Sequence, residues 1–549
     1  MQAIINRTWL VIAGGALLVA CSSSTLPEHG TTSAVTQLFT LEPTPDRSNL
    51  QKSATGFLAT LLADPANEEI TWVNASAELI TSRTQNLAVT LPNGKIAQFN
   101  LRDFNSMADG YEGWVGYKPS AWKQQHPSSS EIDFDPRYYL SIVRHGTQLV
   151  GNLIVEGQRY QLVNLGGRQH ALIKVDESKL PPEAEPGLGE HANEVSTVTT
   201  SLQPKSAHST IRLLFVSTKQ ARAKNPGYRA ALVQGLQDVN QITKNSQVDI
   251  SYELAGFVDA DHDETGKDFA TLLNDLTYRM PEVKAQRDLL RADLVSMLVA
   301  NGELCGGGKP GPAKEYGFSA ISCIPSLAHE IGHNFGMSHD WDGKSNTYTN
   351  GYRYQPASGS LRFRTQMAYD CSPACPRQMF YSNPRLSYQG QPLGTVANHD
   401  VARAMNERRE AVENFYPPFT SKKIRSVQRA KLGLPACLTV TTSRTVAFTG
   451  CESFGDGLGN KFWHWTNNVL TAIESQQGDT SLCLQYTANG DAAGMGACSG
   501  VRSSFSFRDG LIKFSALGLS NCLEGNERSA IPKFNNCYER DDSRWEAIP

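Results

Sequence analysis

The chain has 549 residues, of which 19% are charged, and its formal net charge is -3. A nearly balanced charge gives no electrostatic footprint for a nucleic acid, so no nucleic-acid partner is expected. The length exceeds what one hydrophobic core usually supports, and it predicts a multidomain protein.

The N-terminus predicts export. Arg7 precedes an apolar run at residues 9–20 that is too short to span a membrane and is typical of a signal peptide over residues 1–20. The Leu-Val-Ala-Cys sequence at 18–21 resembles a bacterial lipobox, which implies a lipid on Cys21 and attachment to the outer membrane or cell surface, with release by processing. Plain secretion with an incidental Cys21 is the alternative. Residues 21–70 are rich in Ser, Thr and Pro, and they predict a flexible tether.

Residues 71–180 predict a β-rich domain. Short apolar runs, such as 87–91 and 160–163, are separated by Asn-Gly and Gly-Gly turns. A linker at 181–208 follows, because three prolines lie in its first six residues and a Ser- and Thr-rich run comes after them. Cleavage in this linker would free the rest of the chain from its anchor.

Alternating strands and helices are predicted in a domain at 209–416. Strands are expected at 211–216, 248–258 and 294–299, and an amphipathic helix at 228–244. This order predicts an α/β (α+β) domain. The acidic run at 259–264 lacks the spacing of an EF-hand, so a solvated loop before a helix cap is expected and calcium is unsupported.

One histidine-rich segment carries the most specific chemistry of the chain. Residues four apart share a helix face, so His329 and His333 can bind one metal while Glu330 lies beside its water. Gly336 permits the positive φ that ends the helix and brings His339 in as a third ligand. Three protein ligands and an open position are typical of one catalytic Zn²⁺, with Glu330 as general base in peptide hydrolysis. The alternative is an ordinary helix with solvated histidines.

These residues resemble those of the metzincin zinc peptidases. The sequence at 364–370 is similar to the Met-turn that lies beneath the metal in that clan, with Met367 as its methionine. Tyr369 either stabilises the tetrahedral intermediate or is a structural tyrosine, and both roles stay open. Asp340 follows the third histidine directly, as in the adamalysin-like branch, and the resemblance implies a structural role for it.

The resemblance is closest to the bacterial peptidyl-Asp metallopeptidases, and it covers about residues 208–416. It implies a protein or glycoprotein substrate, cleavage before Asp, and a cationic pocket with Arg364 or Arg377 as the cation. The domain at 71–180 is similar to adamalysin-type prodomains, which implies that it inhibits the enzyme or is removed. The alternative is a structural or binding domain that stays attached.

The cysteines agree with export. Ten of the 11 cysteines lie between Cys305 and Cys537, an even number that suits disulfides in an oxidising compartment. No cysteine lies between 22 and 304, so a propeptide thiol that caps the zinc is excluded. Cys305 is expected to pair with Cys323, and Cys371 with Cys375.

The C-terminal region, 431–549, follows a connector at 417–430 and contains a threefold repeat of about 40 residues. Each repeat has two cysteines 14 or 15 residues apart, a Leu after the first, and an aromatic segment after the second. The expected pairs are Cys437 with Cys451, Cys483 with Cys498, and Cys522 with Cys537. Such repeats predict an all-β trefoil.

The repeat resembles the ricin-type lectins, which implies a glycan partner. The Gln-x-Trp signature of those lectins is not intact, since the matching places read His464-Trp465, Ser506-Phe507 and Arg544-Trp545. The tryptophans are expected in the core of each repeat. Glycan binding and a protein-binding or stabilising role therefore both stay open.

These features predict an exported, lipid-anchored zinc endopeptidase that is made as a proenzyme. The competing hypothesis is a surface adhesin or glycan-binding lipoprotein with a vestigial protease fold. The intact Glu330 favours the enzyme, because a binding protein has no need for a base beside zinc-bound water.

Overall fold

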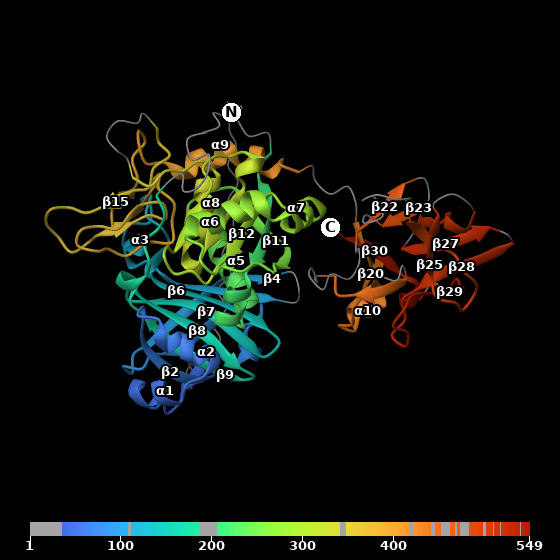
Figure 1. Cartoon of the computed structure of the whole chain (residues 1–549), viewed down its shortest axis with the longest axis horizontal. Helices are drawn as coiled ribbons and strands as arrows, with labels where there is room; N and C mark the ends of the chain where they lie inside the picture. The colour runs from blue at the N-terminus through green and yellow to red at the C-terminus, as the bar shows by residue number, and fades with distance from the viewer. Residues whose placement is uncertain are drawn as a thin grey trace, which may run out of the picture. The chain divides into compact units, whose positions relative to one another are not determined.

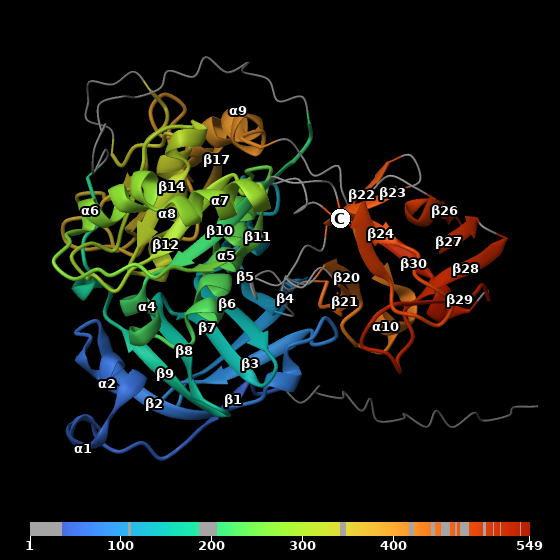
Figure 2. The ribbon, with the colours of Figure 1, turned by 45° about the vertical axis from the view of Figure 1, so that its right-hand side comes forward.

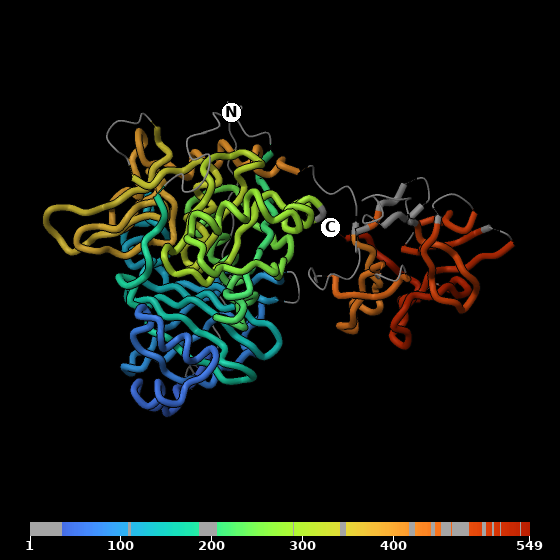
Figure 3. Tube along the Cα trace, viewed as in Figure 1, coloured from blue at the N-terminus to red at the C-terminus, as the bar shows by residue number. Residues whose placement is uncertain are grey.

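The structure is a computed structural model. It describes residues 36–107, 111–185, 206–340, 347–416, 422–440, 445–451, 462–466, 469–472, 482–497, 501–508, 510–516, 518–538 and 540–548, most of which are coloured in Figure 3. The expected signal peptide, Cys21 and Cys498 lie outside these residues. None of the helices in the described ranges is long and apolar enough to span a membrane.

The N-terminal region is one antiparallel sheet of nine strands in the order β1-β2-β9-β8-β7-β6-β5-β4-β3 (Figure 1). The strands are β1 (Phe39–Leu41), β2 (Asn67–Ala75), β3 (Asn86–Thr90), β4 (Ile96–Ser106), β5 (Glu112–Pro119), β6 (Phe134–His145), β7 (Gln148–Val155), β8 (Gln158–Gly166) and β9 (Gln169–Val175). Three short helices accompany them: α1 (Arg47–Ser53), α2 (Gly56–Ala63) and α3 (Ala121–Gln125). The β-rich character predicted for this region is confirmed.

The prediction of a flexible tether as far as residue 70 was wrong for residues 36–70. These residues form β1, α1, α2 and the start of β2, and they bury Phe39, Leu50 and Leu62. The polar residues that suggested a tether serve as caps, as where the Asp46 carboxylate accepts the Asn49 amide at the start of α1. The few apolar residues are enough to fix the segment, because each packs against the sheet.

The second region has a mixed five-stranded sheet in the order β11-β10-β12-β14-β13. Its strands are β10 (Ser209–Ser217), β11 (Ile250–Asp259), β12 (Leu294–Leu298), β13 (Gly306–Gly308) and β14 (Phe318–Ile321), and β13 is the antiparallel edge strand. Its helices are α4 (Lys219–Lys224), α5 (Tyr228–Asn245), α6 (Phe269–Asn274), α7 (Pro281–Leu290), α8 (Leu327–Asn334) and α9 (Val401–Glu413). Two short hairpins, β15 (Arg353–Tyr354) with β16 (Phe363–Arg364) and β17 (Asn383–Tyr388) with β18 (Gln391–Leu393), follow α8. The predicted strands and the long helix are confirmed within two residues at each end.

The edge strand β13 consists of three glycines and packs against α8. A Cβ atom on Gly306 would lie 2.4 Å from Oε1 of Glu330, and one on Gly308 would lie 2.8 Å from the Glu330 carbonyl oxygen. Only glycine lets the strand approach the helix this closely. The histidine-bearing helix therefore has a sheet edge beside it.

Helix α5 joins the two regions, because one side of it lies against β6 and β7 (Figures 1 and 2). Apolar residues of both regions share one hydrophobic cluster, including Phe134 and Tyr139 from the N-terminal sheet and Leu236 and Val239 from α5. The N-terminal sheet is thus docked on the second region through a continuous core.

The C-terminal region is all-β apart from short helices such as α10 (Val427–Lys431). Its strands are β19 (Lys422–Ser426), β20 (Cys437–Val440), β21 (Val446–Thr449), β22 (Phe462–Thr466), β23 (Val469–Ala472), β24 (Leu482–Gln485), β25 (Gly494–Ala497), β26 (Ser506–Arg508), β27 (Leu511–Ala516), β28 (Leu519–Glu524), β29 (Lys533–Asn536) and β30 (Trp545–Ile548). The connector expected at 417–430 is shorter than predicted, because β19 pairs with β22 and β30 and so belongs to this region.

Two repeats of the C-terminal region show the same internal packing. Trp463 and Trp545 are both buried, and their indole N–H groups donate to the carbonyls of Leu438 at 3.1 Å and Leu523 at 2.8 Å. Each of these leucines directly follows the first cysteine of a repeat. The expectation of a core tryptophan is confirmed for Trp545. In the other repeat the residue with the equivalent hydrogen bond is Trp463, two residues before the Trp465 that was matched from the sequence. Closure into a trefoil stays a prediction.

The disulfides in this region agree with the expected pairs where both cysteines are described. Cys437 is bonded to Cys451, and Cys522 to Cys537. Cys483 is also disulfide-bonded. Its expected partner lies outside the described residues.

Candidate active site

Helix α8 places two of the predicted ligands. All eight of its residues are buried, and His329 and His333 lie one turn apart. The helix ends at Asn334, and Gly336 follows it with a φ of +78°, the left-handed conformation that the sequence predicts there. The Gly336 amide donates to the His333 carbonyl at 2.7 Å, and this turn carries the chain back toward His339.

The three imidazoles converge on one point. Their Nε2 atoms lie 2.8 Å (His329 to His339), 3.1 Å (His333 to His329) and 2.9 Å (His333 to His339) apart. Two of the rings have their other nitrogen at a carbonyl: Nδ1 of His329 lies 2.8 Å from the Gln366 oxygen, and Nδ1 of His333 lies 2.9 Å from the Met337 oxygen. A proton on each Nδ1 leaves a lone pair on the facing Nε2.

This donor set fits a zinc ion. Lone pairs that face one another at such distances repel unless a cation lies among them, and three neutral imidazoles are a usual zinc ligand set. Burial lowers the pKa of His329, His333 and His339, which keeps all three rings neutral. The structure therefore brings together the three residues that the sequence singled out.

Glu330 lies beside the imidazoles and is fully buried. Burial raises the pKa of its carboxyl, and the nearby Glu183 carboxylate raises it further. Its position under β13 puts the carboxylate between the helix and the sheet edge.

The Met-turn packs against the other side of the helix. Met367 is completely buried, and a Cβ atom on Gly332 would lie 2.3 Å from its sulfur. The methionine side chain thus fills the space that a side chain at position 332 would occupy. Asp340 forms an ion pair with Arg353 at 2.7 Å, which is compatible with the structural role expected for it.

Tyr369 lies next to the third histidine. Its ring centroid is 4.1 Å from that of His339, and its hydroxyl donates to the Glu185 carboxylate at 2.7 Å. Burial and Glu185 raise the pKa of the phenol, so the hydroxyl keeps its proton. Both roles considered for Tyr369 are compatible with this position.

Both expected disulfides of this region are present. Cys305 is bonded to Cys323, and Cys371 to Cys375. The first bond ties the residue before β13 to the chain that enters α8, so it fixes the sheet edge relative to the histidines. The second closes the loop that follows the Met-turn.

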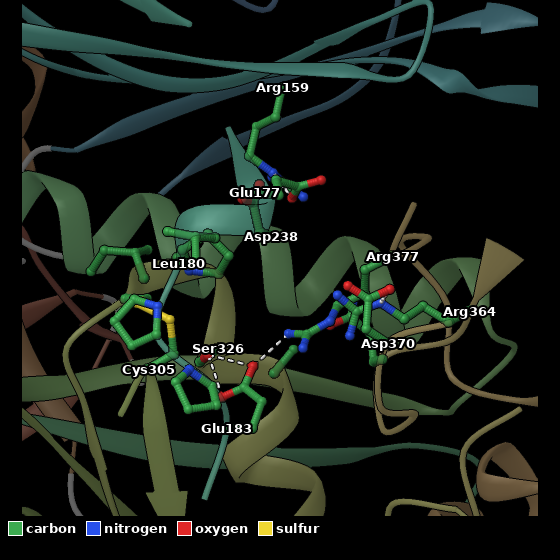
Figure 4. A pocket seen from close by; sticks show the side chains of 18 of the residues that line it. Arg159, Glu177, Leu180, Glu183, Asp238, Cys305, Ser326, Arg364, Asp370 and Arg377 are labelled. Atoms are coloured by element: carbon green, nitrogen blue, oxygen red, sulfur yellow. Dashed lines mark hydrogen bonds and ion pairs between the residues drawn. A yellow bond between two sulfur atoms is a disulfide. The ribbon is translucent and has the colours of Figure 1, made fainter. Parts of the chain in front are cut away.

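The sequence did not predict that the start of the linker lies in the site. Residues 181–185 enter a cavity of about 300 Å³ between the two regions (Figure 4). The Cys305 amide donates to the Pro182 carbonyl at 2.8 Å, and the Ala184 amide donates to the Gly306 carbonyl at 3.0 Å. This segment, which we call the blocking segment, therefore pairs with the edge strand next to α8.

Glu183 is the central residue of the blocking segment. Figure 4 shows its carboxylate held by Ser326 and Arg377, with distances of 2.7 Å from Ser326 Oγ to both oxygens and 2.7 Å from Arg377 Nη1 to Oε1. One carboxylate oxygen of Glu183 lies within 4.8 Å of a ring nitrogen of His329 and of a carboxylate oxygen of Glu330. The Pro-Pro-Glu sequence at 181–183 indicated a linker. The sequence alone could not show that this segment lies against α8, because that proximity depends on the tertiary fold.

Several known proteins are similar to this chain. A family model described as Metallo-peptidase family M12 matches residues 207–381. A peptidyl-Asp metalloendopeptidase of Stenotrophomonas maltophilia (strain R551-3) is 31% identical over 376 residues, which cover 65% of this chain and 89% of that protein. A protein of the same name from Xanthomonas campestris pv. campestris is 28% identical over 387 residues, covering 65% of this chain and 88% of that protein.

Among solved structures, metalloproteinase-II from Bacteroides fragilis is 11% identical, with a TM-score of 0.30, and the match covers 48% of this chain and 84% of that one. A TM-score this low supports no conclusion about the fold.

Proposed function

Because this chain belongs to the M12 family of metzincin zinc metalloendopeptidases, we propose that it is an exported proenzyme that cleaves proteins beside acidic residues once its blocking segment has left the site. The resemblance drawn from residues 329–370 is thereby confirmed at the level of the family. The observation that carries the proposal is the convergence of three neutral imidazoles beside a buried carboxylate.

The chain's own residues have separate tasks in this proposal. His329, His333 and His339 would hold the zinc, which when bound supplies Lewis-acid polarisation of a carbonyl and an acidified water. The Glu330 carboxylate takes a proton from the attacking water and delivers it to the leaving amine. The Met-turn and the carbonyls that accept from the histidine rings keep these groups in place.

Substrate would bind by adding a strand to β13. The backbone groups of Cys305 and Gly306 already form hydrogen bonds with residues 182–184, and the same groups would bind an extended peptide substrate. Tyr369 would be placed to stabilise the developing oxyanion after Glu185 has left, which is the catalytic role considered for it.

The region at 36–185 would act as the inhibitory prodomain. It packs against α5 through the shared hydrophobic cluster. Its residues 182–184 are hydrogen-bonded at the sheet edge where a substrate would bind. Cleavage between Glu185 and Ser206 would allow it to leave.

The ends of the chain would decide where the enzyme acts. We propose that Cys21 carries the lipid anchor and that the C-terminal region, as a trefoil, directs the enzyme to a surface or glycoprotein. The hairpin disulfides and the matching tryptophans of two repeats support the trefoil.

Hydrolysis of a peptide library tests the proposal. The full chain would be assayed before and after limited proteolysis that cuts between Glu185 and Ser206, with cut sites read by mass spectrometry. We expect hydrolysis to rise strongly above the basal rate after that cut, to be lost on chelation, and to return with Zn²⁺. A zinc-loaded, cut and folded protein that hydrolyses no member of the library would overturn the proposal and leave a binding protein as the function.

A further inference from the structure

We propose that Arg377 and Ser326 form the subsite that binds an acidic side chain next to the scissile bond, and that Glu183 fills this subsite in the intact chain. The inference rests on the proposed function and names the residues that would select its substrate. The Glu183 carboxylate is bound by both of these residues.

The subsite is built to hold a carboxylate. The side chains of Arg377 and Glu183 are 13% and 8% exposed, and their nitrogen and oxygen atoms lie 2.7 Å apart. The Ser326 hydroxyl reaches both carboxylate oxygens, so the anion has a charged and a neutral donor. A guanidinium that is this deeply buried is unfavourable without an anion, so departure of Glu183 leaves a site that favours another acidic side chain.

The subsite adjoins the catalytic residues. Ligand atoms of Glu183, His329 and Glu330 all lie within 4.8 Å of one another. The main chain on both sides of Glu183 is fixed on β13, the strand where a substrate would bind. A side chain that reaches Arg377 from this strand therefore belongs to a residue at the bond that is cut.

Arg364, the other arginine considered for this role, has different partners. Its Nε atom lies 3.5 Å from the Asp370 carboxylate, and its Nη1 donates to the Ala368 carbonyl at 3.2 Å. Burial and the neighbouring Arg377 lower the pKa of Arg364 to about 10. Arg364 thus contributes charge to the same cavity, while the Glu183 carboxylate is held by Arg377 and Ser326, which makes Arg364 a matched control (Figure 4).

Glu183 occupies the subsite without being a substrate there. The group that lies within 4.8 Å of ligand atoms of His329 and Glu330 is its side-chain carboxylate, which is not hydrolysed. The Pro182 carbonyl and the Ala184 amide are both engaged with the chain at 305–306. The same contacts that would recognise a substrate therefore keep the intact chain inactive.

Two peptides that differ only in Asp or Asn after the scissile bond test the inference. They are assayed with the full chain carrying Glu183→Ala, alone or together with Arg377→Gln or Arg364→Gln. Glu183→Ala should raise hydrolysis of the Asp peptide at least about tenfold over the unchanged chain. Arg377→Gln should then lower the Asp-to-Asn ratio of kcat/KM by about 30-fold or more, whereas Arg364→Gln should keep it. An unchanged ratio with Arg377→Gln, or an equal loss with both arginine variants, would overturn the assignment.

Two further readouts do not depend on hydrolysis. In the otherwise unchanged full chain, Arg377→Gln should speed hydrogen exchange at the Ala184 and Cys305 amides, and Arg364→Gln should not. Fluorescence anisotropy with the Glu183→Ala/Glu330→Ala protein should show tighter binding of the Asp peptide than of the Asn peptide. The additional change Arg377→Gln should abolish this difference in affinity. If this preference is found but no variant cuts either peptide, the subsite stands and the proposed enzyme function fails. If it is not found, the subsite is wrong.

Discussion

Removal of the Tyr139 hydroxyl should weaken the docking of the N-terminal sheet on α5. This hydroxyl donates to the buried carboxylate of Asp238 at 2.6 Å, across the boundary between the two regions. Asn152 donates to the same carboxylate at 3.0 Å, and burial raises the pKa of Asp238. Tyr139→Phe keeps the ring in the shared core and deletes only the hydrogen bond.

The expected size follows from the buried state of the acceptor. A buried carboxylate that loses one of its donors destabilises the docked form by about 2 kcal/mol. The undocked form is unaffected, because water then reaches Asp238. The undocked fraction should therefore rise by about 30-fold while it remains the minor form.

Hydrolysis by the uncut full chain measures this fraction. Tyr139→Phe should raise the basal rate about 30-fold, in proportion to the undocked population. Tyr160→Phe is the control, because Tyr160 packs in the separate hydrophobic cluster of the same sheet. A Tyr139→Phe protein that is less stable to heat but hydrolyses no faster than the control would refute the idea that docking keeps the enzyme latent.

Three more changes have definite expected outcomes. Gly332→Ala places a methyl group where the Met367 sulfur lies, so it should lower the free energy of unfolding by about 1–3 kcal/mol and weaken zinc retention, measured by thermal denaturation and metal analysis. Burial raises the pKa of Asp293 from 3.8 to about 7, so the folded protein holds this proton more tightly and loses stability as the pH rises from 4 through 7. Asp293→Asn should flatten that part of the stability curve and add up to about 4 kcal/mol at pH 8, and an unchanged curve would contradict the assignment. Trp545→Phe deletes a buried indole hydrogen bond and should destabilise the C-terminal region by about 1–2 kcal/mol in denaturant melts, with no effect on zinc content.

The sequence predicted those parts of the site that depend on local geometry. The spacing of His329 and His333 on a helix, and the turn at Gly336, follow from the dimensions of the helix and from the positive φ that glycine allows. The strands expected at 211–216, 248–258 and 294–299 and the helix at 228–244 were readable from the sequence, since their apolar residues repeat with the period of each element.

Features that depend on long-range contacts were not predicted. Glu183 reaches residues near 330 only after the sheets have formed and docked. Strand β13 was missed because three glycines have low strand propensity, although the close approach of Glu330 requires them. The folded segment at 36–70 was missed because its composition is polar, and a few buried residues such as Phe39 and Leu62 decide its structure.

Zinc content and hydrolysis should be measured together on Glu330→Ala and His333→Ala proteins cut between Glu185 and Ser206, because these two variants separate zinc binding from catalysis. We expect one zinc ion per chain but no hydrolysis for Glu330→Ala, and loss of both zinc and hydrolysis for His333→Ala. Substantial hydrolysis by Glu330→Ala, or full zinc binding by His333→Ala, would contradict this expectation.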